Sequence, residues 1–338
     1  MIMKLTIKDI ARIAGVSPAT VSRVINKKNK GYMKKETEQK VLRIIKEFGY
    51  VPDARAKALR GLKTHLIGVI VPEALSCAYQ EFIGTIVNVC YERGYGTLIC
   101  SSENNAKREL AYVRVLESQR VDGIIIISER LKAQAVNDLI NKGIPIVLVD
   151  EDIPGAEAPI VLTDYYEGAL QATQYLIDLG HKRIAFIKGR PTTLSSQERF
   201  RGYIEALQRN SLDVEDRLIK AGDFTYKSGY EAIETFLKES PDDFTAIFCS
   251  SDLMAFGAIR CIQERGKNVP TDYSVIGFDN IYFSAINNPS LTTVDVPFRK
   301  LTEIAIDMIK NWTEKREKKR SICEAKLVVR RSCAKMVK

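Results

Sequence analysis

Residues 6–26 read TIKDIARIAGVSPATVSRVIN, and they predict two short helices joined by a glycine turn. Thr6 and Asp9 have the spacing of a capping box, in which the hydroxyl accepts a backbone N–H and the carboxylate reaches back to the cap. Apolar residues then recur at helical spacing until Gly15, which ends the first helix. Ser17 is a good N-cap and is followed by a proline, which needs no N–H donor at a first helical position. A second helix therefore begins here.

The second helix has one apolar and one polar side. Val21 and Val24 face the inside, whereas Ser22, Arg23 and Asn26 form an outer side of short polar or cationic groups. Such groups suit phosphates and base edges, and two short helices around a turn have helix-turn-helix geometry. Spacing alone also fits any helical hairpin.

Two further elements complete the first part of the chain. A third helix is predicted over 36–48 and stops at Gly49, which closes a headpiece over residues 1–50. A hinge and linker over 51–63 follow, in which residues 54–60 favour a helix by composition. A helix of about seven residues is marginal alone in water, so this one needs a partner to fold.

Positive charge is concentrated at the start of the chain. The first 63 residues hold sixteen lysines and arginines against five acids, whereas the remainder holds 35 against 37. This asymmetry is typical of a nucleic-acid-binding module fused to an ordinary soluble body. Charge alone leaves a solvated basic face or a membrane-surface patch open.

From His65 onward the pattern changes to strands that alternate with helices. Near-continuous apolar runs, such as LIGVIVP at 66–72 and AIFCSS at 246–251, mark strands buried on both faces of parallel sheets. Two such series predict two lobes, with a ligand cleft where the carboxyl ends of the strands face each other. The predicted fold is an all-α helix-turn-helix headpiece plus an α/β core of two doubly wound parallel-sheet lobes.

Residues 6–26, followed by GYVPDARAKALRG at 49–61, resemble the DNA-binding headpiece and hinge of the lactose/galactose repressor family. The resemblance implies that the second helix lies in the major groove and that paired hinge helices press a leucine into the minor groove. It implies base-reading positions at Pro18, Ala19 and Arg23, phosphate contacts at Ser17, Thr20, Ser22 and Asn26, a wedge at Leu59, and further DNA-binding positions at Thr6, Ala56 and Arg60. An arginine fork on guanine discriminates by about 1–3 kcal/mol. The loop 27–35 is longer and more basic than this family pattern.

The body resembles the sugar-binding core of the same repressors, which is similar to periplasmic binding proteins. The segments NNPSLTTVDVPFRKLTEIAIDMI at 287–309 and AKLVVRRS at 325–332 match the way that family crosses between lobes. The resemblance implies a sensing core over 64–338 with two discontinuous lobes, one of 64–163 with 294–321 and one of 164–293 with 322–338.

Polar side chains at strand ends give the candidate ligand-binding residues, which are Asp150, Asp164, Tyr165, Arg199, Phe224, Ser251, Asp252 and Asp279. Carboxylates accept from vicinal hydroxyls, arginine donates a planar fork, and an aromatic face covers a sugar ring. Asp164 and Asp252 fit an N-cap equally well. Ser251 departs from the amide that is common at its position in the family, which leaves the hydroxyl pattern of the ligand open.

The sequence therefore predicts a ligand-responsive transcriptional repressor that binds a pseudopalindromic operator as a homodimer. The predicted effector is a sugar or sugar phosphate, with a nucleobase-type corepressor as the alternative. Helices near 80–93 and 106–119 are the expected dimer contacts. The effector biases the angle between the lobes and so controls whether the two hinge helices pair.

A sugar-acting enzyme and a solute-binding protein are alternatives of a different class. Against the enzyme, the sequence shows no Gly-rich phosphate loop and no nucleophile elbow.

Composition gives the remaining expectations. Seven scattered cysteines without a C-x-x-C pair, and two histidines, indicate a reduced cytosolic chain with no metal site and no cofactor. No apolar run approaches the roughly 20 residues of a membrane span, and no signal peptide is recognisable, so we expect a cytoplasmic protein without a membrane partner. The lack of a heptad segment favours a dimer over a tetramer. The run EKREKKR at 314–320 is interpreted as a solvated helix end rather than a coregulator site.

Overall fold

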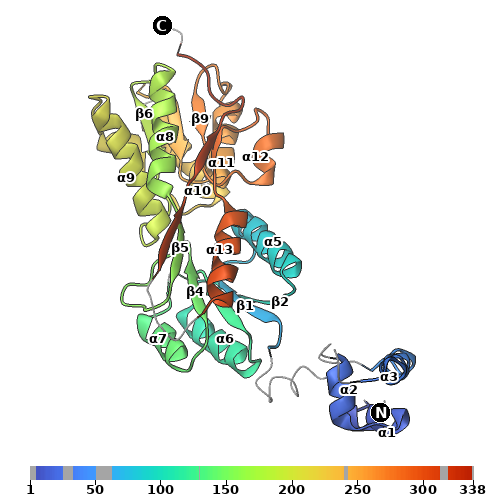
Figure 1. Ribbon diagram of the computed structural model, residues 1–338. Coiled ribbons are helices and arrows are strands. Elements are labelled where there is room, and N and C mark those ends of the chain that lie inside the picture. The colour runs from blue at the N-terminus through green and yellow to red at the C-terminus, as the bar shows by residue number, and fades with distance from the viewer. Residues whose placement is uncertain are drawn as a thin grey trace. The chain divides into compact units, whose positions relative to one another are not determined.

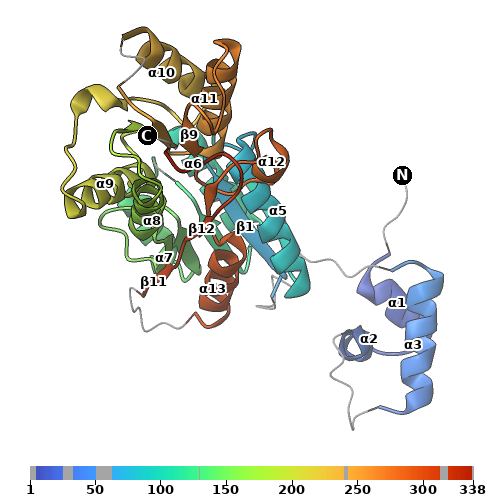
Figure 2. The same cartoon turned by 90° about the horizontal axis from the view of Figure 1, so that it is seen from above.

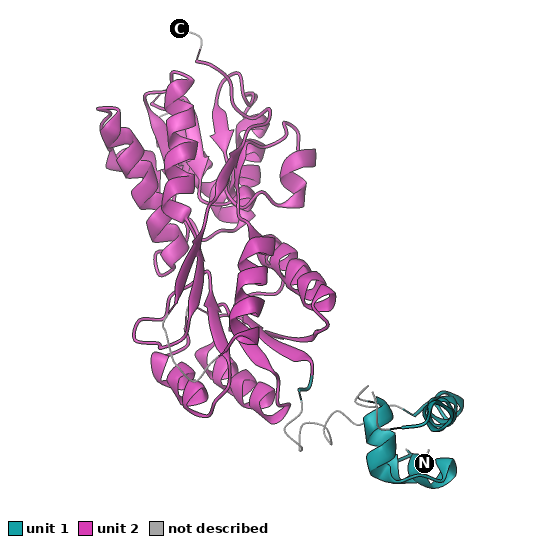
Figure 3. Ribbon diagram, in the orientation of Figure 1, with its two compact units in different colours: residues 1–64 teal, residues 65–338 magenta. Residues whose placement is uncertain are grey.

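The computed structural model describes residues 5–25, 33–50, 63–128, 130–239, 243–312 and 319–336. The chain divides into one compact unit over Met1–Thr64 and a second over His65–Lys338, coloured separately in Figure 3. The predicted hinge helix and most of the basic loop lie outside the described residues. The same holds for four DNA-binding candidates, which are Asn26, Ala56, Leu59 and Arg60.

The described part of the first unit contains three helices, α1 (Ile7–Ala14), α2 (Pro18–Ile25) and α3 (Lys35–Glu47). The predicted capping box begins α1, because the Thr6 backbone N–H donates to Asp9 Oδ2 at 2.9 Å and the Thr6 hydroxyl accepts from the Asp9 backbone N–H at 3.4 Å. Gly15 ends this helix with φ at 64°, in the left-handed region that favours glycine. These local signals place α1 and α2 as the sequence predicts.

A small apolar core holds the three helices together. Its fully buried members come from every helix and include Ile10, Val21 and Val41. Ser17 begins α2 as predicted, since its hydroxyl accepts from the Thr20 backbone N–H at 3.1 Å. The polar side of α2 is thus left on the surface of this unit.

The second unit contains two lobes, each built on a parallel sheet covered by helices on both faces (Figure 1). The sheet of the first lobe has the strand order β11-β5-β4-β3-β1-β2, and all neighbours in it are parallel. The elements of this lobe are β1 (Leu66–Val71), α5 (Cys77–Glu92), β2 (Gly96–Ser101), α6 (Ala106–Ser118), β3 (Gly123–Ile126), α7 (Ala133–Asn141), β4 (Ile146–Val149), β5 (Ile160–Thr163), α13 (Phe298–Lys310) and β11 (Arg320–Cys323).

Alternate residues of each strand point to opposite faces of this sheet. Ile125 and Val147 pack in one apolar cluster with residues of α5 and α13. Their neighbours Ile126 and Leu148 pack in another cluster with residues of α6 and α7. Both faces are therefore covered, which is why the strands read as continuous apolar runs.

The second lobe repeats this plan with the strand order β7-β6-β8-β9. Figure 2 shows α8 beside α9 and α10 beside α11, and the apolar clusters place the two pairs on opposite faces of the sheet. The elements of this lobe are α8 (Tyr165–Asp178), β6 (Ile184–Ile187), α9 (Leu194–Arg209), a short 3₁₀ helix (Asp216–Leu218), β7 (Ile219–Lys220), α10 (Tyr226–Glu239), β8 (Ala246–Cys249), α11 (Asp252–Glu264), β9 (Ser274–Ile276) and α12 (Tyr282–Ile286). The sequence did not predict α12.

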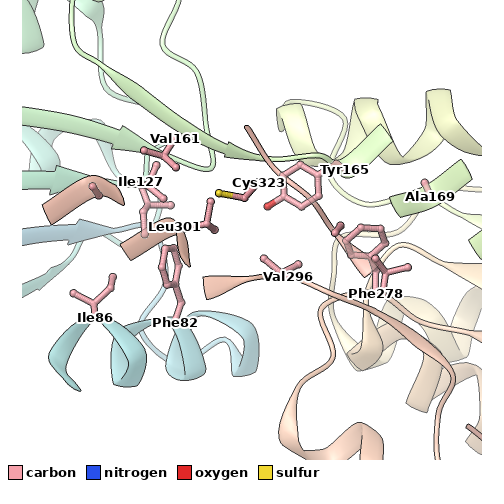
Figure 4. Close-up of a cluster of buried hydrophobic side chains, with 14 of the residues drawn as sticks. Phe82, Ile86, Ile127, Val161, Tyr165, Ala169, Phe278, Val296, Leu301 and Cys323 are labelled. Carbon is pink, nitrogen blue, oxygen red and sulfur yellow. The ribbon is translucent and has the colours of Figure 1, made fainter. Parts of the chain in front are cut away.

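The chain passes between the lobes three times. It leaves β5 to enter α8, returns along β10 (Thr293–Asp295) to α13, and leaves β11 to form β12 (Lys326–Val328), which pairs antiparallel with β10. Because all four residues of β11 pair with β5, the first lobe extends through Cys323 rather than ending at residue 321. Figure 4 shows that apolar packing continues through these crossings, from Val161 and Leu301 in one lobe to Phe278 in the other.

Candidate functional site

A cavity of about 400 Å³ lies between the two lobes, within the second unit. Its walls come from the segments that follow β1, β2 and β4 of one sheet and β6, β7, β8 and β9 of the other. Ligands of open α/β sheets bind at these carboxyl ends of the strands. Six of the eight predicted ligand-binding residues line the cavity, namely Asp150, Tyr165, Arg199, Phe224, Ser251 and Asp279.

Three of these residues are held in backbone conformations that L-amino acids rarely adopt. The φ angles are 68° at Asp150, 71° at Phe224 and 111° at Asp279. Such conformations cost about 1–3 kcal/mol each, and they persist where the surrounding structure demands them, notably at ligand sites. Phe224 lies directly against Gly189, where a Cβ atom would stand 2.0 Å from the ring, so glycine allows the phenyl group this position.

Arg199 lines the cavity, and its side chain is 5% exposed. It donates to Asp279 Oδ1 at 3.0 Å and to the carbonyl oxygen of Ser250. Its guanidinium carbon also lies 3.9 Å from the centre of the Phe278 ring and 4.6 Å from that of Tyr165. Its Nε has no hydrogen-bond partner among the residues that the structure describes. The guanidinium is thus fixed in place by a carboxylate and by aromatic faces.

Asp150 and Tyr165 form a second fixed group. The Thr163 hydroxyl donates to Asp150 Oδ1 at 2.9 Å, and the Tyr165 hydroxyl donates to Oδ2. Burial raises the pKa of the Asp150 carboxyl, which these two hydrogen bonds and Arg199 partly oppose. Burial and the nearby Asp150 carboxylate raise the pKa of Tyr165 well above its ordinary value, so the phenol remains a donor.

The pKa of the Asp279 carboxyl is likewise set by burial and by the nearby Arg199. Burial raises its pKa to about 6, although Arg199 favours the ionised form, and Asp150 and Glu81 raise the pKa further. A carboxyl with this pKa is mostly ionised at pH 7. It can then accept a hydrogen bond from a ligand through its second oxygen.

The structure does not bring Asp164 and Asp252 to the cavity. Asp164 caps α8, where Oδ1 accepts from the Glu167 backbone N–H at 3.0 Å. Asp252 is fully buried in the first turn of α11 and accepts from the Ile281 backbone N–H at 2.9 Å. The cap of α11 is instead Ser251, which also lines the cavity.

Several lining residues were not predicted, and they form contacts between the lobes. Arg190 donates to Glu73 Oε1 at 2.8 Å. Glu151 accepts from the Leu194 backbone N–H at 3.0 Å and from the Ser195 hydroxyl at 3.4 Å. Glu73, Glu151 and Arg190 follow β1, β4 and β6, and this position at a strand end is the sequence signal that could have identified them.

In the first unit, the predicted base-reading residues Pro18, Ala19 and Arg23 are all exposed on α2. The hydroxyls of Ser17 and Thr20 lie 2.9 Å apart and form a hydrogen bond. Thr6 is also exposed, and Ser22 is half-buried. The described DNA-binding candidates are therefore exposed or half-buried, as a contact with DNA requires.

Within the described ranges, the structure forms no group of three or more His, Cys, Asp or Glu side chains that could hold a metal ion. No helix in the described part of the chain is long and apolar enough to cross a membrane.

Two family descriptions match the chain and together cover most of its length. Residues 6–53 match bacterial regulatory proteins of the lacI family, and residues 64–330 match periplasmic binding proteins and the sugar-binding domain of the LacI family. The chain belongs to the LacI family. Its members are transcriptional regulators that bind DNA, so this protein is a ligand-responsive regulator and not an enzyme.

Individual LacI-family proteins match nearly end to end. The repressor PurR of Pasteurella multocida (strain Pm70) is 35% identical over 330 residues, which is 97% of this chain and 98% of PurR. Catabolite control protein A of Priestia megaterium is 38% identical over 314 residues, which is 93% of this chain and 94% of that protein. The lac repressor dimer bound to operator and the anti-inducer ONPF has a TM-score of 0.85 at 27% identity, with 98% of this chain and 99% of that chain covered.

These matches establish how the LacI-family chain works in outline. It binds operator DNA and responds to a small-molecule effector, and the lac repressor that it resembles is a dimer on its operator. The predicted cytoplasmic location follows from this family, because a bacterial DNA-binding regulator acts where the chromosome lies.

Proposed function

We propose that this protein is a repressor whose affinity for a pseudopalindromic operator is controlled by a ligand bound in the cavity between the lobes. The ligand is polyhydroxylated, most simply a sugar. The observation that carries the proposal is the convergence of Asp150, Arg199, Phe224 and Asp279 on one cavity, three of them in left-handed backbone conformations. The match of residues 64–330 to the sugar-binding domain of the LacI family supports the ligand class.

The cavity offers the three kinds of contact that a sugar needs. The carboxylates of Asp150 and Asp279 accept from hydroxyl groups, and the guanidinium of Arg199 donates to a ring or hydroxyl oxygen. The ring of Phe224 covers the apolar face of the ligand. Arg199 is already oriented by Asp279 and by the aromatic rings, so little ordering is required when a ligand arrives.

The three crossings connect the two lobes that form the walls of the cavity. A ligand that contacts both walls favours one angle between the lobes over others, and its differential affinity supplies the energy of the switch. The first lobe transmits this motion to the start of the body, because the His65 backbone N–H donates to Asp122 Oδ2 at 3.1 Å. We propose that the two chain starts of a dimer then move apart or together, and that pairing of hinge residues 51–62 follows.

The dimer surface is proposed from exposed apolar side chains. Val87 and Tyr91 project from α5, and the predicted contact near 106–119 exposes Leu110 and Val115 on α6. On the second lobe, the short helix α12 exposes Tyr282, Phe283 and Ile286. The Tyr282 backbone N–H donates to Glu81 of α5, which places α12 beside that helix. An isologous contact through α5 and α12 therefore draws on both lobes.

An operator-binding assay tests the proposal. DNA that binds the full-length chain is selected from a random pseudopalindromic library, and its affinity is measured by fluorescence anisotropy with and without each of a panel of sugars. At least one sugar changes the affinity, and Phe224→Ala abolishes the response. Tyr230→Ala, which removes an aromatic group of the same lobe outside the cavity, keeps the response. A response that survives Phe224→Ala, or a panel without any response, contradicts the proposal.

A further inference from the structure

The lining of the cavity has a strong excess of negative charge. Its acids are Glu73, Glu103, Asp150, Glu151, Asp223 and Asp279. Among the described residues of the lining, two cationic side chains face them, Arg190 and Arg199. The question for ligand selection is whether any group that could attract an anion is still available, because a guanidinium or a helix N-terminus is what an anionic ligand would use.

The first such group is the Arg190 guanidinium, which is engaged by the protein's own acid. It forms an ion pair with Glu73 across the lobes at 2.8 Å, and the two side chains are 25% and 32% exposed. The Asn104 side-chain amide also donates to Glu73 and fixes that carboxylate. A phosphate that approached Arg190 would meet a carboxylate already bound there.

The second group is the N-terminus of α9, a helix of 16 residues whose first turn faces the cavity. Free backbone N–H groups and the helix dipole make such an end attractive to anions. Here Glu151 of the opposite lobe takes that position, with hydrogen bonds from the Leu194 N–H and the Ser195 hydroxyl. Glu151 is only 7% exposed, so its carboxylate fills the site rather than covering it loosely.

The third group is the Arg199 guanidinium, which Asp279 neutralises at 3.0 Å. Arg190, Arg199 and the N-terminus of α9 are thus each matched by a carboxylate, and Glu103, Asp150 and Asp223 are left in excess. An anionic ligand would be repelled by this excess and would have to displace a carboxylate at each centre.

We propose that Glu73 and Glu151 are specificity-determining residues that exclude ligands bearing phosphate or carboxylate groups. The effector is then a polyhydroxylated molecule that is uncharged or carries an amine, such as an unphosphorylated sugar or an amino sugar. This inference rests on the proposed function and narrows its ligand class from sugars and sugar phosphates to molecules without an anionic group.

The test uses inorganic phosphate as the probe on the full-length protein, with thermal unfolding and isothermal titration as readouts. The double variant Glu73→Gln/Glu151→Gln removes both charges, while Gln keeps an oxygen that can accept from the Leu194 N–H. The matched control is Glu239→Gln, whose carboxylate forms a surface ion pair with Lys220 and is 58% exposed. Circular dichroism confirms that each variant is folded.

The wild-type protein and Glu239→Gln should respond to phosphate no more than to chloride at equal ionic strength. The double variant should bind phosphate saturably and at least about tenfold more tightly, a change of about 1.4 kcal/mol. The basic headpiece is the same in all three proteins, so its own response to phosphate cancels in the comparison.

Two results overturn the inference. One is saturable phosphate binding by the wild type that disappears in Arg190→Gln, and the other is no gain of phosphate binding in the double variant. Neither result bears on the proposed function, which the effect of sugars on operator affinity decides. If neutral and phosphorylated sugars alike leave operator affinity unchanged, the proposed function fails while the phosphate titration still reports on the carboxylates.

Discussion

Replacing Arg199 by methionine removes a buried cation but keeps a side chain of similar length. The ion pair with Asp279 is almost fully inside the protein, since the two side chains are 5% and 11% exposed. Removing one partner of such a pair leaves an uncompensated buried charge and costs about 3–5 kcal/mol. For a domain of this size, that loss lowers Tm by roughly 6–20 °C.

The same helix supplies a matched control. Arg201 pairs with Glu198 at 2.8 Å, but its side chain is 62% exposed, so solvent screens the pair. Arg201→Met should therefore cost no more than about 1 kcal/mol. The double variant Arg199→Met/Asp279→Asn should recover part of the stability that Arg199→Met loses. In the double variant there is no Asp279 carboxylate left buried without its cation.

The assay is urea unfolding of the full-length chain at pH 7.5, followed by circular dichroism. Titration of Asp279 adds an internal check. Its pKa is already raised to about 6 by burial and rises further without Arg199, so the deficit of Arg199→Met should shrink as the pH is lowered toward 5 and the carboxyl becomes neutral. A loss by Arg199→Met no larger than that of Arg201→Met would refute the reasoning that this pair is buried and mutually dependent.

Three further predictions concern the headpiece, the effector and the packing of the second lobe. Arg23→Ala should reduce the ratio of the affinity for the operator to the affinity for an operator with one guanine changed. The expected reduction is roughly 5- to 150-fold, measured by anisotropy, and an unchanged ratio would exclude Arg23 from base reading. Effector affinity should fall about tenfold between pH 7.5 and pH 5, because a ligand hydroxyl donates to the ionised form of Asp279, whose pKa is about 6, and Asp279→Asn should flatten this profile. Gly257→Ala should destabilise the protein by about 1–3 kcal/mol in urea unfolding, because its Cβ atom would stand 2.0 Å from the Tyr226 carbonyl oxygen across the α10–α11 contact; an unchanged midpoint would mean that the helices separate freely.

Local chemistry made much of the fold predictable. The capping box at Thr6 and the turn at Gly15 are short-range signals, and both structures form where the sequence indicates. Apolar strand runs are equally local, since each reflects burial on two faces of a parallel sheet. In contrast, α12 has only five residues, too few for a periodic pattern.

The cavity was predictable only in part, because a strand-end acid has two possible roles. Asp150 and Asp164 both follow a strand of the first lobe, yet Asp150 turns into the cavity and Asp164 folds back to cap α8. The contacts of Glu73 with Arg190 and of Glu151 with α9 join residues from different lobes. Their partners are set by how the three crossings bring the two sheets together, and no short stretch of sequence carries that information.

The third crossing has a consequence for how the protein is made. Residues 320–323 complete the sheet of the first lobe, and residues 326–334 pair with β10 and brace β9, where the Val275 N–H donates to the Ser332 carbonyl oxygen at 2.8 Å. During synthesis, the first lobe therefore waits for this segment before its sheet is finished, and β9 of the second lobe waits for it before its edge is braced. The headpiece can fold long before that moment, because its core draws only on early residues. A nascent chain can thus present a DNA-binding surface before it has a finished sensor to control it.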